Sequence, residues 1–434
     1  MMMNRRILAA LGLALGLAAS PLQSAWSQTT LRMWTFLNPT GQAPREKALK
    51  ILIDRFEAAN PGTKIQVEQQ VWDQMTPKFF AAHGAGNAPD VIWVVMDQFP
   101  AAVQLGALAN LHDLFIKKWP KEQVEAINDT FWEFGGYGAD KHYMIAHSRN
   151  YLGLMYREDF LREAGIDPAS LRTWDDMVAA ATKLTKRNDK GEVTRWGLGL
   201  QFSADKADPS PVLNFIYAKE GRLFADNCKA QWANEAGAKA LARLASYVTD
   251  AKITPPAAVN YSVEDLYDQM AAGRVAIMSA ASVRMPQMQG AINARDIKFM
   301  RFPSDEPGKP LRASATGWAV GAWAKSRNLE AAGKWLEFMS NPDADKVWVE
   351  VGQQVPIYGS SVKAMAGFFA EPKNEFLAVA SEGFKTAWLS PKNCAIGGIR
   401  EDVNVATQQV VLGRKTPMEA LKEAEAKFNQ RHGY

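Results

Sequence analysis

Acid pairs and one close pair of histidines are the groups of this 434-residue chain whose types and spacing could support catalysis. The acid pairs at 175–176 and 264–265 fall in predicted first helical turns, where they interact favourably with the helix dipole, and the pair at 401–402 is expected on a solvated face. His142 and His147 stand at a spacing that does not share a helix face. The sequence contains no P-loop, HExxH or GxSxG motif and no Cys/His spacing typical of structural zinc. We therefore expect no catalytic residue, no metal and no cofactor. A secreted glycan-processing enzyme stays an alternative, because its carboxylate pair would converge only in the folded chain.

Residues that could bind a ligand are easier to identify than catalytic residues. The first of them are polar residues that follow predicted strands. Asp97 and Gln98 come directly after the apolar run 91–96, at the carboxyl end of a strand, where the ligand clefts of α/β folds open. An ionised carboxylate accepts hydrogen bonds from two hydroxyls at once, although Asp97 could instead cap the next helix. Asn38 and Thr40 lie in the loop after the first predicted strand, which is either a ligand loop or an ordinary helix-entry loop. We predict that these four residues contact a ligand.

Two arginines and two tryptophans complete the predicted binding set. Arg149 precedes one apolar strand and Arg284 follows another, and a guanidinium can fork onto paired hydroxyls, a carboxylate or a phosphate. The alternative for each arginine is a surface ion pair. Trp318 and Trp388 are stacking candidates, because an indole can cover the C–H face of a sugar ring, with core packing as the alternative.

The first 27 residues are expected to be a secretory signal peptide. Arg5 and Arg6 precede an apolar run over 7–19, and small and polar residues follow. Because no later stretch approaches about 20 consecutive apolar residues, we expect a soluble periplasmic protein. In that oxidising compartment Cys228 and Cys394 could form a disulfide or could be two unrelated buried thiols.

The elements that must position these residues alternate along the chain. Hydrophobic residues make up 47% of the sequence and charged residues 22%, which excludes a disordered chain, and a net charge of +4 gives no electrostatic footprint for nucleic acid. Helix starts are predicted at Thr173 and Ser262, each of which precedes an Asp by three residues. This alternation predicts two α/β lobes with a largely parallel sheet and a ligand cleft between them. The predicted strands are 31–36, 65–71, 91–96, 151–156, 275–278 and 317–322.

Eight segments, taken in order, resemble the extracellular solute-binding proteins that deliver sugars to ABC importers, the family that includes maltose-binding protein. The resemblance covers nearly the whole chain after the leader, and family members use the position of Asp97. The sequence departs from the family where Arg157 follows Tyr156 and where 281–284 contains no Trp, which removes the usual stacking platform of the second lobe. The segments are 56–61 (FEAANP), 86–91 (GNAPDV), 105–111 (LGALANL), 156–165 (YREDFLREAG), 173–176 (TWDD), 272–278 (AGRVAIM), 316–320 (TGWAV) and 413–421 (GRKTPMEAL).

The resemblance implies a fold like that of type II periplasmic binding proteins, with two α/β lobes, a ligand cleft and several hinge crossovers. On this basis the first lobe is expected to comprise 28–141 plus 297–341, and the second 142–296 plus 342–434. The expected function is that of a periplasmic binding protein that captures a small carbohydrate or polyol by lobe closure and presents it to an inner-membrane ABC permease. The expected protein is a monomer and not an enzyme. An anionic solute, such as an amino acid or a phosphate ester, is the alternative ligand, motivated by Arg149 and Arg284.

Overall fold

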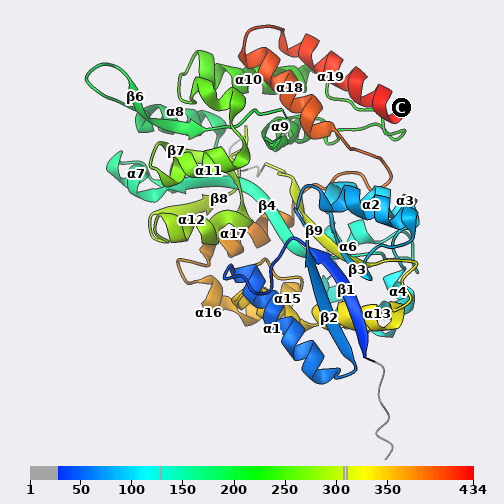
Figure 1. The fold of residues 1–434 in the computed structure, drawn as a ribbon. Coiled ribbons are helices and arrows are strands. Elements are labelled where there is room, and N and C mark those ends of the chain that lie inside the picture. The colour runs from blue at the N-terminus through cyan, green and yellow to red at the C-terminus, as the bar shows by residue number, and fades with distance from the viewer. Residues whose placement is uncertain (1–27, 128–129, 205, 306–307, 309–310) are drawn as a thin grey trace, which may run out of the picture.

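The computed structural model describes residues 28–127, 130–204, 206–305, 308 and 311–434, so the expected signal peptide at 1–27 lies outside the described residues. The described chain alternates strands and helices around a curled sheet (Figure 1). The strands are β1 (Thr29–Thr35), β2 (Thr63–Gln69), β3 (Val91–Val95), β4 (Ile145–Arg157), β5 (Lys186–Arg187), β6 (Val193–Gly199), β7 (Val275–Ala281), β8 (Ile297–Met300) and β9 (Ala315–Ala322).

The sheet follows the order β2-β1-β3-β9-β4-β7-β6-β5, with β8 also paired to β4. The pairs β1–β2, β1–β3 and β6–β7 are parallel, whereas β9 runs antiparallel to both β3 and β4, and β4 runs antiparallel to β7. The prediction of a largely parallel sheet is therefore wrong, and the sheet is mixed. The reason is that β9 and β4 run against their neighbours where the chain passes between the two parts of the sheet.

Strand β4 joins the two parts of the sheet. Its residues 145–151 pair with β9, and its residues 152–157 pair with β7 and β8. We call β1, β2, β3, β9 and residues 145–151 the first sheet half, and β5 to β8 with residues 152–157 the second sheet half. The sequence predicted only 151–156 as a strand, because the buried polar residues His147, Ser148 and Arg149 interrupt the apolar pattern of the earlier part.

Helices cover the two sheet halves separately. Helices α1, α13 and α14 pack on one another beside β1 and β9, while α9, α10, α18 and α19 pack together at the opposite end of the molecule (Figure 1). The α-helices near the first half are α1 (Pro44–Ala59), α2 (Met75–Ala85), α3 (Phe99–Gln104), α4 (Leu111–Leu114), α5 (Lys121–Ile127), α6 (Thr130–Gly135), α13 (Leu329–Met339), α14 (Pro342–Glu350) and α15 (Gly359–Ala364). The others are α7 (Glu158–Glu163), α8 (Trp174–Leu184), α9 (Ser210–Glu220), α10 (Glu235–Thr249), α11 (Val263–Ala271), α12 (Met285–Ala291), α16 (Ala366–Phe369), α17 (Glu375–Phe384), α18 (Ile399–Val411) and α19 (Pro417–His432). Short 3₁₀ turns are η1 (Met96–Gln98), η2 (Ile116–Lys118), η3 (Pro168–Ser170), η4 (Pro256–Asn260) and η5 (Ser282–Arg284).

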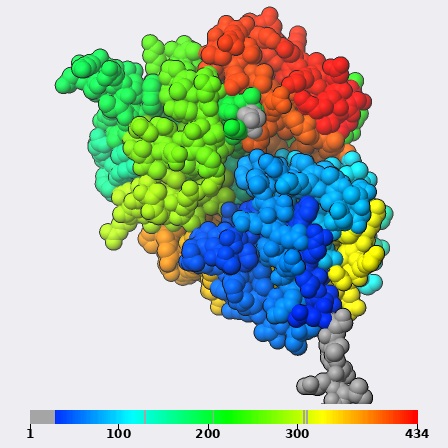
Figure 2. Space-filling view, in the orientation of Figure 1, coloured from blue at the N-terminus to red at the C-terminus, as the bar shows by residue number. Residues whose placement is uncertain are grey.

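Two elements, β8 and α14, lie in a different half of the molecule from the lobe to which the predicted boundaries assign them. Strand β8, predicted with the first lobe, pairs with the end of β4 in the second sheet half. Helix α14, predicted with the second lobe, packs against α1 beside the first sheet half. Short apolar segments predict an element but not the partner on which it packs, so these boundaries required the tertiary structure. In Figure 2 the blue surface of the N-terminal segments meets the green surface of the middle of the chain along a border on the visible face.

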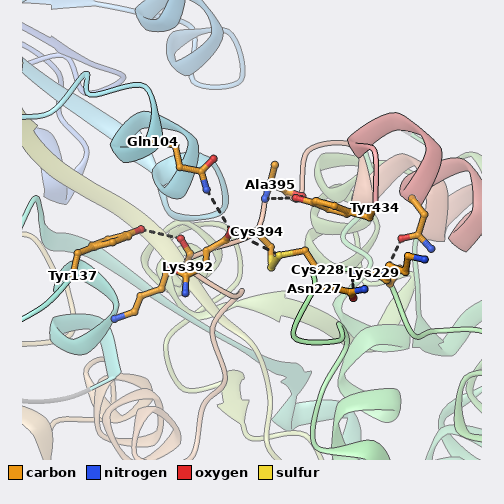
Figure 3. The surroundings of a disulfide bond; sticks show 12 residues. Gln104, Tyr137, Asn227, Cys228, Lys229, Lys392, Cys394, Ala395 and Tyr434 are labelled. Atoms are coloured by element: carbon orange, nitrogen blue, oxygen red, sulfur yellow. Dashed lines mark hydrogen bonds between the residues drawn. A yellow bond between two sulfur atoms is a disulfide. The ribbon is translucent and has the colours of Figure 1, made fainter.

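A disulfide joins Cys228 to Cys394, with 5.4 Å between the two Cα atoms, which confirms the pairing that the sequence left open. Hydrogen bonds also tie the loop that carries Cys394 to the first-half side of the molecule (Figure 3). The hydroxyl of Tyr137 donates to the carbonyl of Lys392 at 3.0 Å, and Nε2 of Gln104 donates to the carbonyl of Asn393 at 3.4 Å. The loop thus contacts both parts of the fold.

None of the helices in the described part of the chain has both the length and the apolar composition that a membrane crossing requires.

Candidate functional site

The carboxyl ends of β3 and β7 lie near the middle of β4, and the same sequence of elements follows each of them. Strand β3 leads into η1 and α3, and β7 leads into η5 and α12. Each following helix carries a proline in its first turn, Pro100 in α3 and Pro286 in α12, where the missing N–H has no helical partner to lose. At the carboxyl end of both strands, the chain therefore passes through a short 3₁₀ turn into a helix that begins with a proline in its first turn.

The strand register brings these two ends together. Val95 of β3 pairs with Trp318 of β9, which pairs with Ser148 of β4, while Ala281 of β7 pairs with Leu152. Ser148 and Leu152 are four positions apart on one strand, so residues that follow β3 and β7 approach a common place. We call residues 148–152 the β4 junction.

Asp97 and Gln98 in η1 are two of the predicted ligand residues at this place. Oδ1 of Asp97 and Oε1 of Gln98 are buried and have no hydrogen-bond partner among the residues that the structure describes. Burial raises the pKa of Asp97, and the positive charge of Arg400 in α18 and the backbone N–H groups of Asp97 and Gln98 oppose that increase. Gln98, and not Asp97, is the N-cap residue of α3, and its side chain makes no capping hydrogen bond.

Two further buried acceptors lie at the junction and at a neighbouring strand end. Oδ1 of Asn150 in β4 and Oε1 of Gln201, two residues after β6, also have no partner in the described part of the chain. Buried acceptors are satisfied in the great majority of native structures, so each unsatisfied one calls for an explanation. A solute rich in hydroxyl donors would supply the missing partners.

Arg284 lies in η5 on the second-half side of the junction. It forms an ion pair with Glu264, its Nη1 donates to Oε1 of Gln287 at 2.7 Å, and its guanidinium lies 5.1 Å from the ring centroid of Tyr267. The surface ion pair considered for this residue is therefore present. Burial lowers the pKa of Arg284.

Arg45 is a residue that the sequence reasoning missed. It lies in the first turn of α1, where Nη1 donates to Oγ of Ser148 at 3.2 Å and the guanidinium lies 5.1 Å from the ring centroid of Phe36. Burial lowers the pKa of Arg45 to about 10, and the charge of Arg284 adds to the decrease. A signal was available, because a basic residue at a helix N-terminus opposes the helix dipole.

Arg149 is buried within β4 rather than on the surface. Its Nη1 donates to the carbonyl of Pro356 at 2.6 Å, and its guanidinium lies 4.6 Å from the ring of Phe131 and 5.2 Å from that of Phe384. These contacts tie the β4 junction to the segment after α14 and to α17, so they place Arg149 inside the packing of the two halves.

Asn38 and Thr40 form a local turn at the entry to α1. Oδ1 of Asn38 accepts from the backbone N–H of Thr40 at 3.0 Å and from its hydroxyl at 2.8 Å. This arrangement is the helix-entry loop that the sequence offered as an alternative. A ligand contact by these two residues stays a prediction.

Both predicted stacking tryptophans are packed against protein rings. Trp318 is 7% exposed and lies 4.8 Å from Phe36 between ring centroids. Trp388 is stacked on Tyr217 at 5.0 Å, and its Nε1 donates to Oδ1 of Asn214 at 3.0 Å. Trp318 thus lies beside the contact of Phe36 with Arg45, whereas Trp388 lies in the packing of α9. By contrast Trp72, just after β2, is 55% exposed.

No group of three or more His, Cys, Asp or Glu side chains gathers as metal ligands within the described ranges. His142 and His147 are both buried, and burial lowers the pKa of His142 to about 4 and that of His147 to about 3. Both imidazoles are therefore neutral at neutral pH. What the site offers is a set of acceptors and two guanidiniums around one junction.

Comparison with known proteins agrees with this arrangement. A family model described as bacterial extracellular solute-binding protein matches residues 41–346. The arabinooligosaccharide-binding protein of Bacillus subtilis (strain 168) is 24% identical over 353 residues, which cover 78% of this chain and 75% of that protein. The sn-glycerol-3-phosphate-binding periplasmic protein of Escherichia coli O1:K1 is 24% identical over 437 residues, which cover 96% of this chain and 95% of that protein.

A similar solved structure is an ABC transporter solute-binding protein from Thermotoga lettingae bound with α-D-tagatose. It has a TM-score of 0.77 and 24% identity, and the match covers 93% of this chain and 99% of that one. The maltose/maltodextrin-binding domain of Bdellovibrio bacteriovorus bound to maltotriose has a TM-score of 0.74 at 17% identity, covering 93% and 99%. These matches confirm the predicted fold of type II periplasmic binding proteins.

Proposed function

Because this chain belongs to the family of bacterial extracellular solute-binding proteins, we propose that it is the periplasmic substrate-binding component of an ABC importer. Its ligand is a small carbohydrate or polyol, held between a lobe built on the first sheet half and a lobe built on the second. Its partner is an inner-membrane ABC permease, and the protein acts as a monomer. The relatives support this proposal, since arabinooligosaccharide and tagatose, named in two of them, are polyhydroxyl compounds.

The observation that carries the proposal is the set of buried acceptors without protein donors. Asp97 and Gln98 come from the first sheet half, Asn150 from the β4 junction and Gln201 from the second. An acceptor that no protein group satisfies becomes favourable when a ligand hydroxyl donates to it. Because acceptor oxygens come from both sheet halves, they suit a solute that has hydroxyl donors on more than one of its faces.

Lobe closure follows from the same placement. A solute that contacts residues after β3 and residues after β7 makes both sets of contacts only when the lobes are together. Binding therefore shifts the population toward the closed form by the difference in affinity between the closed and open forms. The permease can then distinguish loaded from empty protein by shape, and the solute is released unaltered.

A panel of sugars and polyols tests this function by thermal shift and by small-angle X-ray scattering. A ligand that binds only the folded protein should raise Tm as its concentration exceeds Kd, and closure should decrease the radius of gyration. Asp97→Ala and Trp318→Ala should each lower the affinity at least tenfold, because one removes an acceptor and the other removes the indole beside the junction. Asp54→Ala, which removes an exposed carboxylate on α1, is the matched control.

Two results would contradict the proposal. If no sugar, polyol or derivative raises Tm, the binding function fails. If the pure protein instead releases new reducing ends from oligosaccharides with steady turnover, the glycan-processing alternative replaces it.

A further inference from the structure

Arg45 carries a charge that the described protein does not neutralise directly. No carboxylate in the described part of the chain lies within ion-pair distance of Arg45, whose contacts are the hydroxyl of Ser148 and the ring of Phe36. The adjacent Glu46 lowers the electrostatic cost, but its oxygens already accept from the backbone N–H groups of Asn38 and Ala43. Arg45 is half-buried, and a charge that is partly withdrawn from water is costly unless a partner of opposite charge is supplied.

Arg284 brings a second guanidinium toward Arg45 from the opposite sheet half. The turn η5 is held against the β4 junction by the N–H of Tyr151, which donates to Oγ of Ser282 at 3.2 Å. Arg45 contacts the same junction through Ser148, three positions earlier. The two positive charges are close enough for Arg284 to disfavour the charged form of Arg45.

The charged groups around this pair are the two guanidiniums and two carboxylates, Glu46 and Glu264, both of which are already engaged by protein donors. Glu264, which pairs with Arg284, has a side chain that is 61% exposed, so solvent screens much of its effect. Tyr267 and Phe36 present aromatic rings, and Ser148 presents a hydroxyl. Arg45 and Arg284 approach the β4 junction from separate sheet halves, and their like charges repel unless an anion lies between them.

We propose that the solute bears an acid group, a carboxylate or a phosphate, on a polyhydroxyl body, and that Arg45 and Arg284 bind this acid group from opposite lobes. The inference rests on the proposed function and narrows its ligand class. Guanidinium groups suit this task because their fixed fork of N–H donors matches the oxygens of a carboxylate or phosphate. The acceptors Asp97 and Gln98 then take the hydroxyls of the same solute.

Matched pairs of compounds test the acid group. The probes are D-gluconate against D-glucitol, D-glucuronate against D-glucose, and glycerol 3-phosphate against glycerol, each measured by titration calorimetry and thermal shift. The expected result is that the acid member of at least one pair binds at least tenfold more tightly than its neutral counterpart. The first two pairs report a carboxylate, and the third reports a phosphate.

Variants assign the preference to the two arginines. Arg45→Gln and Arg284→Gln should each weaken binding of the acid member at least tenfold more than they weaken binding of the neutral member. Arg45→Lys should retain part of the affinity because it keeps the charge without the fork. Arg414→Gln, which removes an equal charge from an exposed site after α18, is the control and should change nothing. The Tm of the ligand-free Arg45→Gln protein should stay equal or rise, because a half-buried charge without an ion-pair partner is removed.

Failure of the acid-group inference and failure of the binding function give different results in these experiments. If neutral sugars bind as tightly as their acids, or if Arg45→Gln lowers the ligand-free Tm and leaves the acid preference intact, the inference fails while the binding function stands. If no compound of either set binds and the radius of gyration never decreases, both fail.

Discussion

Single residues near the β4 junction are polar where the fold would favour apolar side chains. The buried guanidinium of Arg149 contacts the carbonyl of Pro356 and two aromatic rings, so protein groups offset part of the cost of burying its charge. Arg45 and Asp97 are half-buried and form no ion pair in the described chain, and Oδ1 of Asp97 is a buried atom without a hydrogen-bond partner there. Natural sequences commonly depart from the rules of stability at functional sites, and the proposed ligand site contains both of these residues.

Titration of two buried residues near this region should affect stability in opposite directions. Burial lowers the pKa of His147 to about 3, so the unfolded chain binds more protons below pH 6.5 and stability falls as the pH falls. Burial raises the pKa of Asp345 to about 6, so the folded chain binds more protons between pH 4 and 6 and stability falls as the pH rises.

The two contributions can be separated by unfolding in urea between pH 4 and 6. In His147→Gln the slope of unfolding free energy against pH should decrease by about 1.4 kcal/mol per pH unit, and in Asp345→Asn it should increase by about the same amount. The slope is the readout because each variant also changes absolute stability. Slopes identical to that of the wild type would show that these groups do not titrate as their burial requires.

Two features of the strands position the site: the register in which β9 pairs with β4, and a glycine that lets the two backbones lie close together. The pairing of β9 with β4 holds Trp318 opposite Ser148, so a change in that register would move both sides of the site. Gly317 lies in this pairing with φ of 152°, and a Cβ built there would lie 1.8 Å from the carbonyl oxygen of Ser148. Only glycine accommodates that approach.

Gly317→Ala should therefore destabilise the protein by about 2–4 kcal/mol, because the clash is with backbone rather than with a flexible side chain. Gly290→Ala in α12 is the matched control, since a Cβ there meets nothing within 4 Å, and it should be neutral or stabilising by up to about 1 kcal/mol. Urea unfolding of both variants measures the difference. Equal stability for the two variants would show that the β4 and β9 backbones can separate at low cost.

At the scale of the whole molecule, separated stretches of chain make each half, and several segments cross between them. Strand β4 is one crossing, and the loop around Cys394 is another place where contacts to both parts occur. The disulfide closes a loop of 166 positions between Cys228 and Cys394. Such a closure mainly restricts the unfolded chain.

Removing the disulfide should lower the unfolding free energy by up to about 5 kcal/mol on the chain-entropy model. The Cys228→Ser, Cys394→Ser double variant and the wild type in reductant should show the same decrease in urea midpoint. Reductant added to the double variant is the control and should have no effect. Unchanged midpoints would show that the cross-link does not contribute to stability.

The amino-acid sequence by itself determined the local elements, because their signals are local interactions. The helix starts at Thr173 and Ser262 are confirmed as reciprocal capping boxes with Asp176 and Asp265. The apolar run 91–96 became β3 and the first residue of η1, with Asp97 directly behind it, as its continuous hydrophobicity predicted. The solute-binding fold could also be predicted from the sequence, because eight short segments resemble the family and occur in the family's order.

Only the tertiary structure decided which distant residues meet. Arg45 and Arg284 are far apart in the chain, and they approach one another because β3, β9, β4 and β7 pair in one particular register. The disulfide, the sheet half that contains β8 and the packing of Trp388 on Tyr217 depend on the same long-range pairing. Periodicity reports which face of an element is buried, but the identity of the neighbour is set by contacts that form only when the whole sheet assembles.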